Sequence, residues 1–379
     1  MNLFLLEIKR ILKSLSFWIF FVIMCVFMAT QLSDSYIIDR PTRDDVTYKT
    51  EDDLNYIYPT LLKELIKETE LNSFDTYPRG FYRNVSLDDN EINLMKKLIE
   101  DLCGTNYEDA STLGIHNIPN RENLENNLKK IDSLLGGGSS YSINRYKNMF
   151  GQVPTSYEER IDEYKLMKAN GLDESFARYF CDYAGITIFI LIYFIPLGVF
   201  LKDSNKSISS SIFTKSSSTR KILFTRLWAM AIVTISSILL IFTCYELILV
   251  NLYGIELLNP VTAYGLIILW LFPNIVLGIS LGSLITILIN NILAGVFCFL
   301  ISFMYIITSS PNISGAYGFS PIIRHNIVGM EKYFLDNFNI LLENRIMWFI
   351  ISLLIALIAS IALDKKRVGR LWSISLIIF

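Results

Sequence analysis

Six runs of mostly apolar residues, each near the length of a membrane-crossing helix, dominate the pattern along the chain. They cover residues 15–32, 184–201, 227–250, 261–289, 292–308 and 346–363. A bilayer core about 30 Å thick needs roughly 20 apolar residues in a helix, so the pattern predicts an all-α polytopic membrane protein with six transmembrane helices. The first run has no clear small-x-small cleavage site and exceeds the apolar region of a signal peptide, which favours a retained anchor over a cleaved leader.

Residues 1–14 alternate apolar and charged positions at helical spacing. Phe4, Ile8 and Ile11 fall on one face, and Lys9 and Arg10 lie beside it. This pattern is typical of an amphipathic helix that lies in the inner membrane interface before the chain enters the bilayer. The alternative interpretation is a cytoplasmic extension of the first span.

The long segment 33–183, between the first two runs, is expected to form a helical domain of its own, because a segment of this size can close a small core. Thr155 with Glu158 has the spacing of a capping box at one helix start. The cluster from Gly136 to Ser140 breaks the helical pattern and lacks the Lys-Ser/Thr that follows in a phosphate loop. Three apolar stripes at helical spacing predict the core helices. Their members are Leu54, Ile57, Tyr58, Leu61, Leu62, Leu65 and Ile66; Ile92, Met95, Leu98, Ile99 and Leu102; and Leu124, Leu128, Ile131, Leu134 and Leu135.

Proline and glycine mark special positions in the second half of the chain. The run 261–289 is long for a straight crossing and contains Pro273, which predicts a kinked or tilted span. Within it, Gly278 and Gly282 have the small-xxx-small spacing of close helix packing. Residues 309–345 are too polar to cross and contain several Pro and Gly residues, which predicts broken helices at the outer interface. A re-entrant arrangement of these broken helices, shielded by neighbouring spans, stays open. An ordinary outer loop is the alternative.

The distribution of charge predicts the orientation in the membrane. Although the chain is 52% hydrophobic and has a net charge of only -2, residues 1–14, 202–226 and 364–379 together carry 13 Lys and Arg against only three acids, Glu7, Asp203 and Asp364. The positive-inside rule therefore places both termini and the loop 202–226 in the cytoplasm, which agrees with an even number of spans. Residues 33–183 then form a large extracellular domain, with 28 Asp and Glu against 18 Lys and Arg. Such acidity gives no support to nucleic-acid binding.

The sequence carries no recognisable catalytic or metal-binding grouping. Its two histidines, His116 and His325, lack metal-type spacing, and no nucleophile elbow, His-Glu-x-x-His or Walker A motif occurs. We therefore expect no enzymatic activity, no metal and no bound cofactor on this chain. Of the five cysteines, only Cys103 and Cys181 could face the outside together, and both a disulfide and two free thiols remain open.

Glu246 is the only acidic residue inside a predicted span. It lies about four residues, or roughly 6 Å of helical rise, from the end of the run 227–250. This position favours snorkelling of the carboxylate to the outer interface over a role in coupling or in contact with a substrate.

The serine-rich segment before the third span combines a linker composition with an apolar edge. Ile208, Ile212 and Phe213 stand at helical spacing among serines, and Arg220 and Lys221 follow them. A plain linker would need no apolar face, whereas a short helix that inserts an apolar edge into a partner's groove would. The pattern therefore predicts a small cytoplasmic docking surface.

This arrangement resembles the type-2 ABC exporter permeases over residues 1–32 and 184–364. That family has an interfacial N-terminal helix and six spans with both termini inside. Its loop between the second and third spans runs from an acidic residue through small polar residues and an apolar pair to Ser/Thr-Arg-x-x-(Ile/Leu)-Leu and a basic residue. Serines replace the Gly and Glu often found in that loop, and the Pro before the Ser-Arg pair is absent. The matching positions are Asp203, Ser209 to Ser211, Ile212, Phe213, Ser218, Arg220, Ile222, Leu223 and Arg226.

The resemblance implies a permease that works as a dimer, with an identical or related second permease subunit and two copies of a cytoplasmic ABC ATPase. ATP and Mg would bind to that ATPase, whose closure would pass through the region from Ile208 to Phe213. Such permeases export peptides, lipids, drugs or polysaccharides. The acidic domain and the aromatic-rich membrane part favour an amphipathic peptide or a lipid-like molecule. The expected location is a bacterial cell membrane, in contact with lipids.

Two other functions remain open from the sequence. A membrane-anchored receptor or signalling protein would bind its ligand with the extracellular domain and would need no docking loop. An ATPase-coupled machine that transmits force outward without moving a substrate would need only about four spans. The number of spans and the docking loop favour the exporter.

Overall fold

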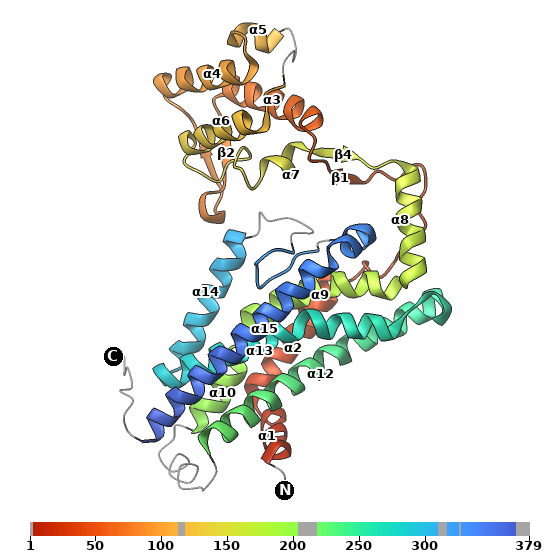
Figure 1. Cartoon of the computed structure of the whole chain (residues 1–379), viewed down its shortest axis with the longest axis vertical. Helices are drawn as coiled ribbons and strands as arrows, with labels where there is room; N and C mark the ends of the chain where they lie inside the picture. Colours follow the sequence, from red (N-terminus) through yellow and green to blue (C-terminus); the bar gives the residue numbers. More distant parts are fainter. Residues whose placement is uncertain (1–2, 113–117, 204–217, 310–316, 326, 369–379) are drawn as a thin grey trace. The chain divides into compact units, whose positions relative to one another are not determined.

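The computed structural model describes residues 3–112, 118–203, 218–309, 317–325 and 327–368 (Figure 1). The chain divides into two compact units. The bundle unit consists of Met1–Arg40, Ile161–Tyr305 and Ser314–Phe379, and the insert unit consists of Pro41–Arg160 and Ile306–Ile313. Most of the insert unit is therefore a single insertion into the chain of the bundle unit.

Apolar helices form the bundle unit. They are α1 (Leu3–Leu12), α2 (Leu15–Gln31), α9 (Leu172–Leu191), α10 (Phe194–Asp203), α12 (Thr219–Tyr253), α13 (Pro260–Ile289), α14 (Leu293–Ser309) and α15 (Glu331–Arg367), with a 3-10 turn, η2 (Ile255–Leu257), between α12 and α13. The central helix is α13, because it packs against α9, α10, α12 and α15 (Figure 1). Its apolar side chains are not confined to one stripe, which is the pattern of a helix surrounded by other helices.

Four segments in the described part of the chain are long and apolar enough to cross a membrane: Leu172–Asp203, Thr219–Tyr253, Pro260–Ile289 and Glu331–Arg367. α1 and α2 together would make a fifth, although they meet at a bend of 61°. α14 is apolar but shorter. The prediction of a mostly helical membrane protein is therefore confirmed, whereas the count of six spans and the side on which the termini lie remain predictions.

Two helices begin earlier than the apolar runs predicted. α15 starts at Glu331 and continues unbroken through the last predicted span, so the prediction of broken helices over 309–345 is wrong for its second part. α12 starts at Thr219, which places the end of the predicted loop 202–226 inside a helix. The first turns of both helices are polar. They are helical, but they lack the continuous apolar run from which a span is recognised in the sequence.

The insert unit is a small domain with its own core. Its helices are α3 (Leu54–Leu71), α4 (Asp89–Cys103), α5 (Tyr107–Thr112), α6 (Arg121–Leu134), α7 (Tyr146–Phe150) and the first residues of α8 (Tyr157–Asn170). The three apolar stripes lie on α3, α4 and α6 or directly after them, and their members pack into one core. Two small antiparallel sheets were not expected: β1 (Tyr48–Thr50) with β4 (Gln152–Pro154), and β2 (Phe74–Thr76) with β3 (Arg83–Val85), the latter pair joined through a 3-10 turn, η1 (Pro78–Gly80).

A capping box starts α8 one residue later than the sequence pattern predicted. Ser156 Oγ accepts the Glu159 backbone N–H at 3.2 Å, and Glu159 Oε2 accepts the Ser156 N–H at 3.1 Å. Thr155 and Glu158 have the same spacing, but the Thr155 N–H donates to Thr47 O at 2.8 Å and so extends the β1–β4 pairing. The strand pairing thus decides which of two overlapping motifs caps the helix.

Candidate functional site

Four charged side chains form a largely buried cluster at the end of the bundle unit where α1 lies. Glu7 and Arg10 come from α1, Asp203 is the last residue of α10, and Arg226 lies near the start of α12. Arg226 Nε donates to Glu7 Oε1 at 2.8 Å, and its Nη1 lies 2.5 Å from Asp203 Oδ2. Arg10 forms a further ion pair with Asp203. We call this group of two acids and two cations the α1 charge cluster.

The side of α1 that carries Glu7 packs against the bundle unit, because the Glu7 carboxylate forms its ion pair with Arg226 there. Glu7 and Ile11 are buried, whereas Leu5 and Leu12 are exposed. The aromatic ring of Phe200 covers Arg226, with its centroid 5.7 Å from the guanidinium carbon. A buried charge is tolerated only when it is paired, so the cluster selects this face of α1. The exposed leucines leave an apolar face of the kind that an interfacial helix requires.

The other predicted residues of α1 lie around this cluster. Phe4 and Ile8 are half-buried, Ile11 is buried, and Lys9 is exposed. Of the predicted interfacial residues, only Arg10 takes part in the ion pairs of the cluster. The sequence had suggested an interfacial role for Arg10, and the structure adds a specific partner.

Only two of the predicted docking residues lie in the part of the chain that the structure describes. Ile208, Ile212 and Phe213 lie outside the described residues. Arg220 and Lys221 are exposed in the first turn of α12. They are therefore exposed, positively charged residues, six and five positions before Arg226 of the α1 charge cluster.

Gly278 and Gly282 lie where α13 crosses the join between α9 and α10. A Cβ atom added to Gly278 would overlap the side chain of Ile192, and one added to Gly282 would lie 2.9 Å from Pro196 Cγ and 3.2 Å from Tyr193 Cα. At these two positions α13 thus approaches the join between α9 and α10 more closely than a residue larger than glycine would allow, as expected for small-xxx-small spacing.

We expect Gly278→Ala to lower the Tm of the purified protein, because the added methyl group overpacks against Ile192 at a cost of about 1–3 kcal/mol. Gly265 on the same helix is the matched control, since a Cβ there meets no atom within 4 Å. Gly265→Ala should keep or raise the Tm, because alanine is favoured over glycine in a helix by about 1 kcal/mol. Equal changes in Tm for the two variants would contradict the packing role of Gly278.

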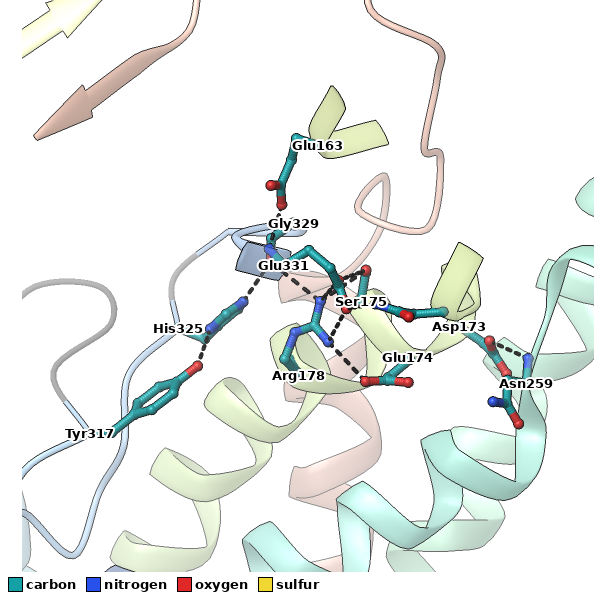
Figure 2. Close-up of polar contacts among 11 residues, drawn as sticks. Glu163, Asp173, Glu174, Ser175, Arg178, Asn259, Tyr317, His325, Gly329 and Glu331 are labelled. Carbon is teal, nitrogen blue, oxygen red and sulfur yellow. Dashed lines mark hydrogen bonds and ion pairs between the residues drawn. The ribbon is translucent and has the colours of Figure 1, made fainter. Parts of the chain in front are cut away.

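A second buried charged cluster lies where α9 meets the start of α15 (Figure 2). Arg178 and Glu331, whose side chains are both fully buried, form an ion pair. Ser175 Oγ donates to Glu331 Oε2 at 2.9 Å, and Asn170 Nδ2 donates to Glu331 Oε1 at 2.8 Å. Glu174 Oε1 lies 3.4 Å from Arg178 Nη1. We call these residues the α9–α15 cluster; its hydrogen bonds satisfy both carboxylate oxygens of Glu331, as a buried charge requires.

His325 links the α9–α15 cluster to the segment before α15 (Figure 2). Its Nδ1 lies 3.0 Å from Tyr317 Oη and its Nε2 lies 2.8 Å from Gly329 O, while its backbone N–H donates to Asp182 Oδ2 at 3.1 Å. Burial lowers the pKa of His325 to about 4, and the positive charge of Arg178 acts in the same direction. The imidazole is therefore neutral near pH 7 and holds this segment in place through hydrogen bonds.

Arg345 is another buried cation of the bundle unit, and neutral oxygens surround it. Its Nη1 donates to Trp270 O at 3.0 Å, and its Nη2 donates to Pro321 O at 3.0 Å. The side-chain oxygens of Asn274 and Asn344 accept further hydrogen bonds. Arg345 thus ties α13 to α15 and to the segment that precedes α15.

Arg178, Glu331 and Arg345 could not be recognised from the sequence because all three lie outside the predicted spans, Glu331 by 15 positions. A hydropathy pattern treats a charge at the end of an apolar run as solvent-exposed, yet α9 and α15 bury these charges in their extensions. The signal that could have found Arg178 is the continued helical spacing of Phe176 and Phe180 ahead of the second span.

Glu246 is buried on α12, with 6% of its surface exposed. It therefore does not snorkel to the surface as the sequence favoured. The reason is that it shares a helix face with Phe242 and Leu249, both fully buried, so this face points into the bundle unit.

Cys103 and Cys181 are free thiols, the first half-buried in the insert unit and the second fully buried in the bundle unit. Burial raises the pKa of Cys103. A thiol with a raised pKa is a poor nucleophile, so this cysteine shows no sign of reactivity.

The charged clusters connect helices of the bundle unit. Among the described residues, no group of three or more His, Cys, Asp or Glu side chains could hold a metal ion. Comparisons with protein-family models, with curated proteins and with solved structures found no match.

Proposed function

We propose that this chain is the transmembrane permease subunit of an ATP-driven exporter, with energy supplied by a separate cytoplasmic ATPase. It would move an amphipathic peptide, lipid-like or drug-like molecule out of a bacterial cell. It would work as a dimer with an identical or related permease subunit. ATP and Mg would be bound by the ATPase, so this chain would carry no catalytic residue.

The α1 charge cluster is the observation that carries this proposal. Asp203 and Arg226 flank the predicted docking segment, and both are held by ion pairs to α1 and to each other. Energetic coupling between distant sites needs rigid elements and connected polar networks. A segment whose two flanks are fixed in this way can pass a partner's movement into α10 and α12, which a slack linker could not do.

The proposed orientation fits these roles. The positive-inside rule would place α1 and the docking segment in the cytoplasm, on the side where an ATPase would bind. The insert unit would then face the outside, and its acidic surface would favour a cationic, amphipathic substrate. The long apolar helices of the bundle unit would provide the path through the membrane.

The test is co-purification of the detergent-extracted chain with the ATPase encoded nearest to it. Ile212→Asp with Phe213→Asp should reduce the recovered ATPase by at least about tenfold, because two unpaired carboxylates would enter an apolar contact. The matched control is Phe81→Asp with Tyr82→Asp, which changes two exposed aromatic residues of the insert unit. This control should retain the ATPase.

Failure of the well-folded wild-type chain to bind any ATPase would remove the proposed energy source. Tight binding of a ligand by the insert unit would then favour the receptor function instead. Equal loss of the ATPase in both double variants would show general damage and would reject a specific docking role for the segment.

A further inference from the structure

Two carboxyl groups are buried side by side in the bundle unit, away from the clusters described above. Asp173 lies in the first turn of α9 and is fully buried, and Glu246 on α12 is 6% exposed. Phe176, three positions after Asp173 on α9, stacks on Phe242, four positions before Glu246 on α12, so the packing of these two helices brings the two carboxyl groups together. Neither group was expected from the sequence to be part of a pair.

Among the described residues, only one of the four carboxyl oxygens of this pair has a hydrogen-bond donor. Asp173 Oδ1 accepts the backbone N–H of Asn259 at 2.7 Å. In the described part of the chain, Asp173 Oδ2 and both carboxylate oxygens of Glu246 are buried without a hydrogen-bond partner. A carboxylate can only accept hydrogen bonds, so two ionised carboxylates that lie side by side cannot form a hydrogen bond with each other.

In the part of the chain that the structure describes, no cation pairs with these two carboxyl groups, and the neighbouring Glu174 adds a further negative charge. Arg178, the nearest cation along α9, is ion-paired with Glu331 and Glu174. Glu256 in η2 is exposed and negative. The tyrosines on the helices packed here have partners of their own: Tyr245 with Met28 O, Tyr253 with Ile38 N and Tyr36 O, and Tyr264 with Thr243 Oγ1.

Two like charges buried side by side repel strongly, because the interior has a low dielectric constant. A single bound cation would remove this repulsion. A proton needs no space of its own, and it converts one carboxylate into the donor that the other lacks.

We propose that Asp173 and Glu246 form a binding site for one proton, shared between their carboxyl groups. The shared proton connects the start of α9 to α12, and its release leaves two adjacent negative charges that push these helices apart. The site thus makes the packing of α9 on α12 sensitive to pH. This inference does not rest on the proposed export function.

Infrared spectroscopy of the purified full chain tests this inference directly. A protonated carboxyl group has a carbonyl stretch that a carboxylate lacks, and wild type should show this band and lose it as the pH rises. Glu246→Gln removes one ionisable group and keeps a donor, so its spectrum should lack the band. Glu256→Gln removes an exposed carboxylate near the same place and should leave the band unchanged.

Stability gives a second readout. The unfolded chain releases the shared proton more readily than the folded chain, so the Tm of wild type should fall as the pH rises through the titration of the pair. Glu246→Gln and, independently, Asp173→Asn should reduce this dependence. Wild type without the infrared band, or with the same pH profile as both variants, would overturn the proposal. Stabilisation of wild type alone by sodium or a divalent cation would overturn it in favour of a metal ion.

Discussion

Arg178→Met should lower the free energy of unfolding by about 3–5 kcal/mol, because it leaves the fully buried Glu331 without its cation. The cost arises from the unpaired charge more than from lost contacts. Arg178 is also packed against Phe334, with its guanidinium carbon 4.5 Å from the ring centroid, and methionine keeps much of that apolar contact. Chemical unfolding of the purified protein in mixed micelles measures the change.

Two further variants separate the ion pair from simple loss of packing. Arg178→Met with Glu331→Met removes both charges and should recover much of the stability, since a buried pair replaced by apolar side chains is often close to neutral. Lys165→Met breaks an exposed pair with Asp162, whose side chains are 69% and 71% exposed, and should change stability little. If the double variant loses as much stability as Arg178→Met and Glu331→Met lose when their separate effects are added, this account is contradicted.

The apolar runs were the most predictable part of the fold. Four of the six runs lie within helices that can cross a membrane, because continuous apolar character over such a length has few other structural uses. The core of the insert unit was predictable for a similar reason, since its stripes repeat at the helical period. Local periodicity carries this information without any knowledge of the rest of the chain.

Pairings between distant residues could not be predicted in the same way. Arg178 and Glu331 are 153 positions apart, and Glu7 and Arg226 are 219 positions apart. Each of these residues looks like an ordinary solvated charge in its own sequence context. Only the tertiary arrangement brings it to a partner, and the same is true of β1 and β4, whose pairing decides where α8 begins.

Glu246 illustrates a limit of position-based reasoning. Its distance from the end of an apolar run suggested that the carboxylate reaches the membrane surface. The helix extends beyond that run, to Tyr253, and the face that carries Glu246 is covered by α9. Sequence position therefore gave the depth along the helix but not the direction of the side chain.

Arg226→Gln should release α1 from the bundle unit, and on the proposed function it should also weaken binding of the ATPase. Glu7 would lose its 2.8 Å ion pair and would keep only Arg10, at 3.8 Å. Leaving a buried carboxylate in this state should lower the stability of the α1 contact by about 3–5 kcal/mol. Faster hydrogen exchange of residues 3–12 would measure the release of α1, and co-purification would measure the ATPase.

The paired neutral variant distinguishes charge balance from the presence of a particular arginine. Glu7→Gln with Arg226→Gln removes the unpaired acid, while Asp203 keeps its ion pair with Arg10. Hydrogen exchange of α1 should therefore return toward the wild-type rate. If ATPase binding returns as well, the α1 charge cluster acts by fixing the flanks of the docking segment. If α1 is held again but the ATPase is still lost, the charges of Glu7 and Arg226 are needed for coupling in addition to the position of α1, and the cluster has more than a positioning role.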